Sequence, residues 1–193
     1  MHSIVRFAAA ARSVLAGAGT AEERWAEIAR LVPALLGDPE LRACAAGWTD
    51  THGNGYTTTT NLLLYEDPEY GFVINSLVKA QGGLVRPHDH AHTWTAYGVI
   101  EGTERIVRYR IVEGDRYAKQ ARLERTSDTI VQPGFVDLIG PYEAHAENAA
   151  SGRTVAIIVR SHKTGRALHA IYDLESCKVE RRPGPAQVPV LLE

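Results

Sequence analysis

A histidine-rich segment, Arg-Pro-His-Asp-His-Ala-His-Thr-Trp-Thr over residues 86–95, carries the side chains best suited to chemistry. His88 and His90 are two positions apart, so on a β-strand both imidazoles project from one face. His145 lies in a second polar segment, residues 141–148, on a different predicted strand. Three neutral imidazoles that converge in this way predict a transition-metal site with coordination positions left for substrate or oxygen.

The spacing around these histidines adds weight, because His-x-His alone is a weak signal. Gly82 is followed by five residues, His88-x-His90, four residues, Thr95, six residues and Gly102. This frame resembles the first motif of the cupin family, in which the position of Thr95 is usually a glutamate ligand. With a non-ligand there and the distal histidine kept, the chain is similar to the three-histidine thiol dioxygenases, the cysteine dioxygenase family.

The resemblance implies a fold and an activity. The fold is mainly β, a cupin double-stranded β-helix (jelly-roll barrel) with N-terminal helices packed outside. The activity is that of a non-haem iron dioxygenase that uses dioxygen to oxidise a small organic substrate. That substrate would be a small thiol, acidic in one version of the prediction, and the product a sulfinate. His88, His90 and His145 would hold Fe(II). Zinc would favour tetrahedral closure, and copper or nickel stay open by ligand type alone.

The substrate side departs from that family. Its members carry an Arg or Gln on an early strand to clamp a carboxylate, where this chain has Thr59 and Thr60. A Ser-x-His-x-Tyr relay follows the third metal histidine in the family, and the same interval here falls on Ile158, Arg160 and His162. Arg160 occupies the inward-facing position of this interval, and a guanidinium binds a carboxylate through two hydrogen bonds. Arg160 is therefore a candidate anchor.

Other residues near these motifs have competing interpretations. Tyr97 is a candidate hydrogen-bond donor to oxygen or substrate, or a tyrosine packed in the barrel. His162, at the last relay position, completes the catalytic candidates with Arg160 and Tyr97. Arg86 is a second possible anchor or a rim residue, and His92 is a rival metal ligand or a rim histidine.

Two further functions stay open from the sequence. One is cleavage of a carbon–carbon bond in a diketone or phenolic substrate, which three-histidine cupins also resemble. The other is a cupin that senses a ligand without turnover.

Periodicity predicts a single domain, 1–193, in three parts. Residues 1–48 read as helices, with a capping box at Thr20 and Glu23 and a third start at Asp38. Residues 57–175 read as a β-barrel, and residues 176–193 as an extended tail in which 181–185 cannot hold regular hydrogen bonds. The predicted strands are 58–65, 70–80, 84–90, 93–100, 104–112, 122–126, 128–132, 136–139, 145–148, 154–161 and 168–174.

Composition and charge limit the classes of binding partner that we expect. The chain has 193 residues, 45% of them hydrophobic, with a formal net charge of −2. Mixed charge favours neither nucleic acid nor a membrane surface as partner. Cys44 and Cys177 have no spacing typical of a disulfide framework or zinc knuckle. We expect a cytoplasmic monomer or homodimer whose partners are a small-molecule substrate and dioxygen.

Overall fold

A computed structural model describes residues 2–51, 60–80, 82, 85–165 and 167–190. Among these residues three helices come first: α1 (His2–Ala16), α2 (Ala21–Leu36) and α3 (Pro39–Ala46). Thr20 and Glu23 form the predicted capping box at the start of α2, and Asp38 caps α3 by accepting from Leu41 N–H at 2.9 Å. None of the helices in the described part of the chain is long and apolar enough to cross a membrane.

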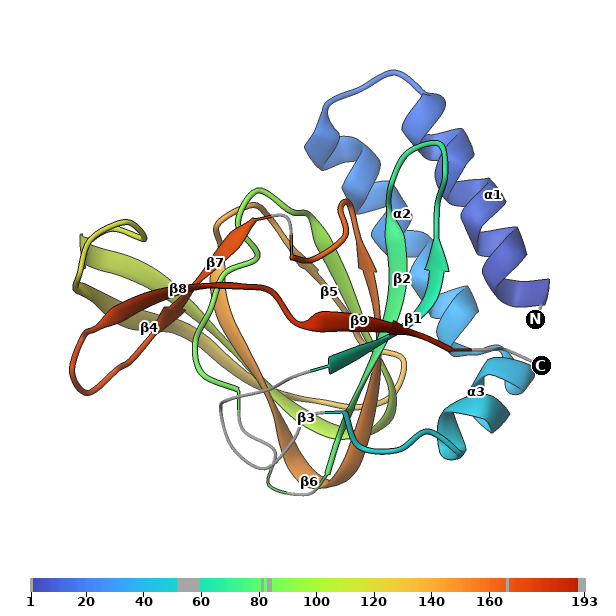
Figure 1. Ribbon diagram of the computed structural model, residues 1–193. Coiled ribbons are helices and arrows are strands. Elements are labelled where there is room, and N and C mark those ends of the chain that lie inside the picture. Colours follow the sequence, from blue (N-terminus) through green and yellow to red (C-terminus); the bar gives the residue numbers. More distant parts are fainter. Residues whose placement is uncertain (1, 52–59, 81, 83–84, 166, 191–193) are drawn as a thin grey trace.

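In the described ranges nine strands follow and form a barrel-like β-structure (Figure 1). They are β1 (Thr60–Glu66), β2 (Val73–Lys79), β3 (Thr95–Gly114), β4 (Ala121–Val131), β5 (Val136–Ile139), β6 (Ala144–Arg160), β7 (Leu168–Tyr172), β8 (Val179–Pro183) and β9 (Ala186–Pro189). The main sheet has the order β4-β3-β6-β2-β1-β9, with β5 also paired to β3. The predicted fold class, mainly β with helices outside, is confirmed.

The centre of the sheet, β2, β3 and β6, has two unlike buried faces. Alternate residues of a strand point to opposite faces. One face, called here the outer face, packs against the helices and presents Ile74, Val78, Ala96, Ile157 and Val159. The other, the inner face, lines the barrel and includes Leu77, Tyr97, Val99, Ala156 and Ile158.

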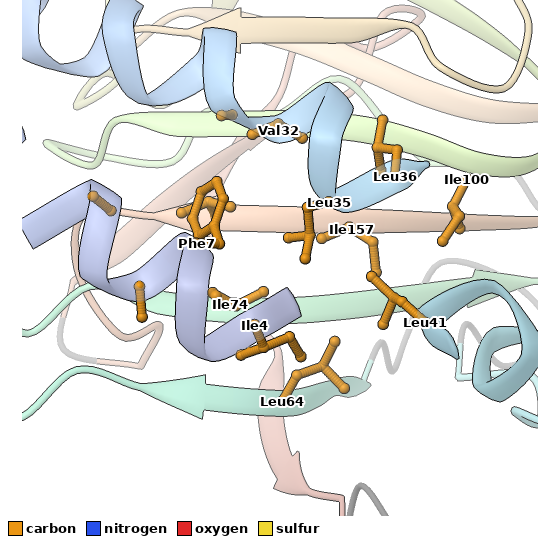
Figure 2. Close-up of a cluster of buried hydrophobic side chains, with 14 of the residues drawn as sticks. Ile4, Phe7, Val32, Leu35, Leu36, Leu41, Leu64, Ile74, Ile100 and Ile157 are labelled. Atoms are coloured by element: carbon orange, nitrogen blue, oxygen red, sulfur yellow. The ribbon is translucent and has the colours of Figure 1, made fainter. Parts of the chain in front are cut away.

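Helix α2 lies directly on the outer face. Gly98 of β3 permits this approach, because an added Cβ would lie 2.9 Å from Leu36 Cδ1 and 2.9 Å from Val32 Cγ1. Figure 2 shows Val32, Leu35 and Leu36 of α2 over the strands that carry Ile100 and Ile157, with Phe7 and Ile4 of α1 beside them. The helices thus close the sheet on one side, as the sequence predicts.

Several predicted strands differ from those observed. The predicted strands 93–100 and 104–112 merge into β3, 122–126 and 128–132 into β4, and 145–148 and 154–161 into β6. Register shifts interrupt the pairing of these long strands. The prediction that 181–185 hold no regular hydrogen bonds was wrong for 181–183, which belong to β8 and pair with β7. Further along the tail, β9 runs parallel to β1. Partners distant in sequence supply these hydrogen bonds.

The predicted strand 84–90 was also wrong. Residue 84 lies outside the described residues, and 85–90 form an irregular segment with one isolated bridge residue, His88. Residues 58 and 59 of the first predicted strand also lie outside the described residues.

Candidate metal centre

Four side chains gather inside the barrel, with potential ligand atoms all within 4.8 Å of one another. They are His88, His90, His145 and Glu147, called here the His/Glu cluster. The ring centroids of the three histidines are 4.7–4.9 Å apart. His90, His145 and Glu147 are buried, and His88 is of intermediate exposure.

Backbone hydrogen bonds bring the two histidine segments together. His88 N–H donates to the carbonyl of His145 at 2.9 Å, and His145 N–H donates to the carbonyl of His88 at 3.0 Å. On the other side, Asp89 N–H donates to the carbonyl of Ala170 in β7 at 3.0 Å. The irregular segment therefore lies between β6 and β7, although it forms no regular strand itself.

Asp89 fixes the conformation between the two ligand candidates. Its buried carboxylate accepts from Arg116 Nε at 2.9 Å and from the N–H groups of Ala91 and Ala170 at 2.9 and 3.1 Å. Burial alone would raise the pKa of Asp89, but these hydrogen bonds outweigh it and lower the pKa. Ala91 has a φ of 53°, a left-handed conformation that a non-glycine residue keeps only when its surroundings impose it.

Electrostatics keep two of the imidazoles neutral. Burial, with the nearby His145, lowers the pKa of His88 to about 4, and burial lowers the pKa of His90 well below its ordinary value. Burial also disfavours protonation of His145, but the negative charge of Glu147 outweighs it and raises that pKa. Neutral imidazole is the form that binds a metal.

The donor atoms of the cluster fit a cation. Both ring nitrogens of His90 and Nδ1 of His145 are buried with no hydrogen-bond partner among the described residues. His88 Nδ1 lies 3.0 Å from the carbonyl of Arg86, so in the neutral ring Nδ1 carries the proton and Nε2 the lone pair. His145 Nε2 and Glu147 Oε1 are 2.9 Å apart. Three imidazoles and a carboxylate suit a divalent transition metal.

A buried polar network lies behind Glu147. Lys79 Nζ donates to Tyr97 Oη at 2.9 Å, to Glu104 Oε2 at 2.9 Å and to the carbonyl of Glu147 at 3.0 Å. Tyr97 Oη in turn donates to Glu104 Oε2 at 2.7 Å. Burial raises the pKa of Tyr97 well above its ordinary value. The hydroxyl proton of Tyr97 is thus committed to Glu104, which argues against the predicted donation to oxygen or substrate.

Arg160 lies on the inner face and is 4% exposed. Its Nε and Nη1 have no hydrogen-bond partner within the described ranges. Burial lowers the pKa of Arg160 to about 10, while the charge of Glu147 opposes this shift. A buried guanidinium without hydrogen bonds is costly, so Arg160 is the predicted catalytic residue whose surroundings call most clearly for a ligand.

The remaining predicted residues lie away from the cluster. His162 is exposed, in the turn after β6, with Nδ1 2.9 Å from Ser161 Oγ and its ring centroid 5.1 Å from that of His92. The end of β6 at Arg160 explains this displacement, because the alternation that would have turned His162 inward stops there. His92 is exposed too and is outside the cluster. Arg86 forms a 3.7 Å ion pair with Glu180, as expected of a rim residue. Of the early threonines, Thr60 begins β1 and Thr59 lies outside the described residues.

Two residues near the metal candidates were missed from the sequence. Glu147 follows His145 by two positions on one strand, and this shared parity was a usable signal. His169 of β7 is 5% exposed, with its ring centroid 5.4 Å from that of His90, and burial lowers its pKa to about 3. The sequence around His169 carries no spacing that relates it to His90.

No family model matches the chain, and no curated protein matches its sequence. Among solved structures, it is similar to hydroquinone 1,2-dioxygenase PnpCD in complex with Cd2+ and 4-hydroxybenzonitrile (TM-score 0.46, 12% identity, 82% of this chain and 79% of that one). It is also similar to a protein with a double-stranded β-helix domain from Klebsiella pneumoniae, with a TM-score of 0.43 and 15% identity over 64% of this chain and 91% of that one.

A third similar structure is the cupin domain of Schizosaccharomyces pombe Cnp3, with a TM-score of 0.41 and 7% identity over 53% of this chain. The chain spans 64% of the length of that structure. Similarity at this level carries no information about reaction or substrate, which must be argued from the cluster itself.

Proposed function

We propose that this protein is a metal-dependent dioxygenase of cupin type, with iron(II) held by the His/Glu cluster. The observation that carries the proposal is the convergence of three histidines and Glu147, with buried ring nitrogens that have no partner among the described residues. Such nitrogens are costly in a folded protein unless a ligand occupies them. Bound iron would supply the redox chemistry and the place where substrate and dioxygen meet.

The reaction proposed is oxidation of a small thiol to a sulfinic acid, RSH + O2 → RSO2H, in which both oxygen atoms pass to sulfur. This part rests on the resemblance of the His88-x-His90 frame, with Thr95 at the usual glutamate position, to thiol dioxygenases. Glu147 departs from that three-histidine pattern by bringing a carboxylate to the cluster from β6. Its negative charge offsets one charge of a divalent cation.

The surrounding chain would hold these ligands in place. Asp89 orients the segment between His88 and His90 through Arg116 and β7. Lys79 holds the backbone of Glu147 through its carbonyl. Outer contacts of this kind preserve ligand geometry, and losing one typically costs a metal site about 10–100-fold in affinity.

Metal analysis of variants tests the site. His145→Ala should lose more than roughly 100-fold in iron affinity, since removing a ligand exceeds the loss of an outer contact. His92→Ala, which removes an exposed histidine, is the matched control and should bind iron like wild type. Equal loss in both variants would refute the ligand assignment.

An oxygen-electrode screen of the iron-loaded protein tests the reaction. Small thiols should consume one dioxygen per thiol, with a sulfinate as product. Uptake with diketones or catechols instead would replace the proposed reaction by carbon–carbon bond cleavage. If one of these compounds binds but no thiol, diketone or catechol causes oxygen uptake, the protein would be a ligand-sensing module.

A further inference from the structure

Two buried polar side chains lie opposite each other on the inner face. Thr95 of β3 pairs with Arg160 of β6 in the antiparallel register, and directly paired residues project to the same face with Cβ atoms about 4.5–5.5 Å apart. Thr95 is 0% exposed, and its Oγ1 has no hydrogen-bond partner within the described part of the chain. Arg160, at 4% exposed, has the same deficit at Nε and Nη1. Together they present a hydroxyl and a guanidinium edge.

The charges around this pair leave the guanidinium uncompensated. Lys79 and Glu104 neutralise each other at 2.9 Å. Glu147 is 2.9 Å from His145, and among the described residues no carboxylate forms an ion pair with Arg160 within 4.0 Å. Glu147 acts on Arg160 only at longer range. A cation bound by the cluster would draw further on the charge of Glu147, so the need for another anion near Arg160 would increase.

We infer that Arg160 and Thr95 form a carboxylate subsite beside the His/Glu cluster, so that the substrate is a small organic acid. The identification as a substrate subsite rests on the proposed function, whereas anion binding itself does not. A carboxylate can accept two hydrogen bonds from the guanidinium and one from the threonine hydroxyl. Arg160 and the cluster both lie inside the barrel, and the charge of Arg160 acts on the imidazoles of His88 and His90, so an acid held there lies near the cluster.

Calorimetric titration of the metal-free protein tests the subsite without any turnover. The probes are propionate and propionamide, which match in shape and differ in charge. Wild type should prefer propionate by roughly 30-fold or more, the equivalent of about 2 kcal/mol. Arg160→Met, which keeps the length and removes the charge, should abolish the preference. Thr95→Val should lower propionate affinity about 5-fold, as expected for one hydrogen bond.

Controls separate this site from general electrostatics. Arg122→Met removes an exposed guanidinium of β4 and should bind propionate like wild type. Arg160→Lys keeps the charge without the paired donors and should bind propionate between wild type and Arg160→Met. Equal affinity of wild type for the two probes, or no saturable propionate binding, overturns the subsite. If Arg160→Met fails to fold, the preference for propionate over propionamide, measured in wild type and in Thr95→Val, still tests the subsite.

Oxygen uptake distinguishes the subsite from the proposed reaction. The iron-loaded protein should oxidise 3-mercaptopropionate with a kcat/KM at least roughly 30-fold above that for its amide. Equal rates for acid and amide would overturn the subsite and leave the thiol reaction standing. No uptake with either thiol, together with Arg160-dependent propionate binding, would remove the proposed reaction and support the anion site.

Discussion

The two faces of β2, β3 and β6 are both buried, yet their side chains differ in polarity. The outer face is aliphatic and is covered by α1, α2 and α3. The inner face combines an apolar cluster that includes Val99 and Ile158 with the buried polar side chains of the His/Glu cluster and Arg160. Figure 1 shows the helices gathered on one side of these strands.

The contrast is sharpest for two buried charges. Asp67 follows β1 and joins it to α1, accepting hydrogen bonds from Arg12 Nε at 2.6 Å, Tyr65 Oη at 2.9 Å and Tyr70 N–H at 2.8 Å. Arg160 on the inner face lacks such partners at Nε and Nη1. A satisfied buried charge contributes to the fold, whereas an unsatisfied one weakens it and is kept for another reason.

Removing the cover of the outer face should have the largest effect. Deleting residues 1–48 would expose the aliphatic residues of β2, β3 and β6 to water, a contiguous apolar surface that soluble proteins avoid. The product should be insoluble or molten, with lost near-ultraviolet circular dichroism. A soluble, iron-binding remainder would show that the barrel does not need its helices.

A smaller change at the same interface should be costly but tolerated. Leu35 of α2 is 2% exposed and packs in the cluster between the helices and the sheet. Leu35→Ala should lower the free energy of unfolding by about 2–5 kcal/mol through lost burial and a cavity. Val5→Ala on α1 is the matched control, because Val5 is 66% exposed, and it should change stability by no more than about 0.5 kcal/mol. Urea denaturation measures both, and equal effects would contradict the assigned packing.

The outer face is the part that sequence periodicity predicts well. The apolar repeats of the helices, the Thr20–Glu23 box and the Asp38 cap are local patterns, and each fixes an element without knowledge of distant residues. The turn at Pro133-Gly134 likewise ends β4 near its predicted limit. These features depend on neighbours within a few positions.

The site was less predictable, because its geometry depends on pairing across the chain. His88 and His90 were expected on a strand, yet their segment is held between β6 and β7 by a few backbone hydrogen bonds and isolated bridges instead of a continuous ladder. The inward position of Arg160 was predictable from parity, but the absence of partners at its Nε and Nη1 among the described residues was not. Glu147 was within reach of the same parity argument, whereas His169 required the fold.

Asp67 provides the next prediction. Burial alone would raise its pKa, but the hydrogen bonds from Tyr70 N–H, Arg12 and Tyr65 outweigh it and lower the pKa. Asp67→Asn should cost about 1–3 kcal/mol at pH 7. Because the folded pKa lies below the unfolded value of about 3.9, this stabilisation is complete above that value and is lost as pH falls through the folded pKa. Chemical denaturation of both proteins from pH 7 to pH 2 should show the difference shrinking, and a constant difference would contradict the ionic role.

Arg160 should show the smallest effect on stability, and of opposite sign. Arg160→Met removes a buried charge that lacks local hydrogen bonds and leaves an apolar side chain of similar length, so the free energy of unfolding should stay equal or rise by about 1 kcal/mol. Arg153→Met is the matched control on the same strand. Arg153 donates to the carbonyls of Ala45 and Trp48 at 2.8 and 2.7 Å and pairs with Glu101 at 2.5 Å, so its loss should cost about 1–3 kcal/mol. If Arg160→Met destabilises as much as Arg153→Met, Arg160 supports the fold, and the inner face is not reserved for a ligand. Opposite signs would instead show that the same change to Met, made at two positions seven residues apart on β6, distinguishes an arginine that supports the fold from one that serves a ligand.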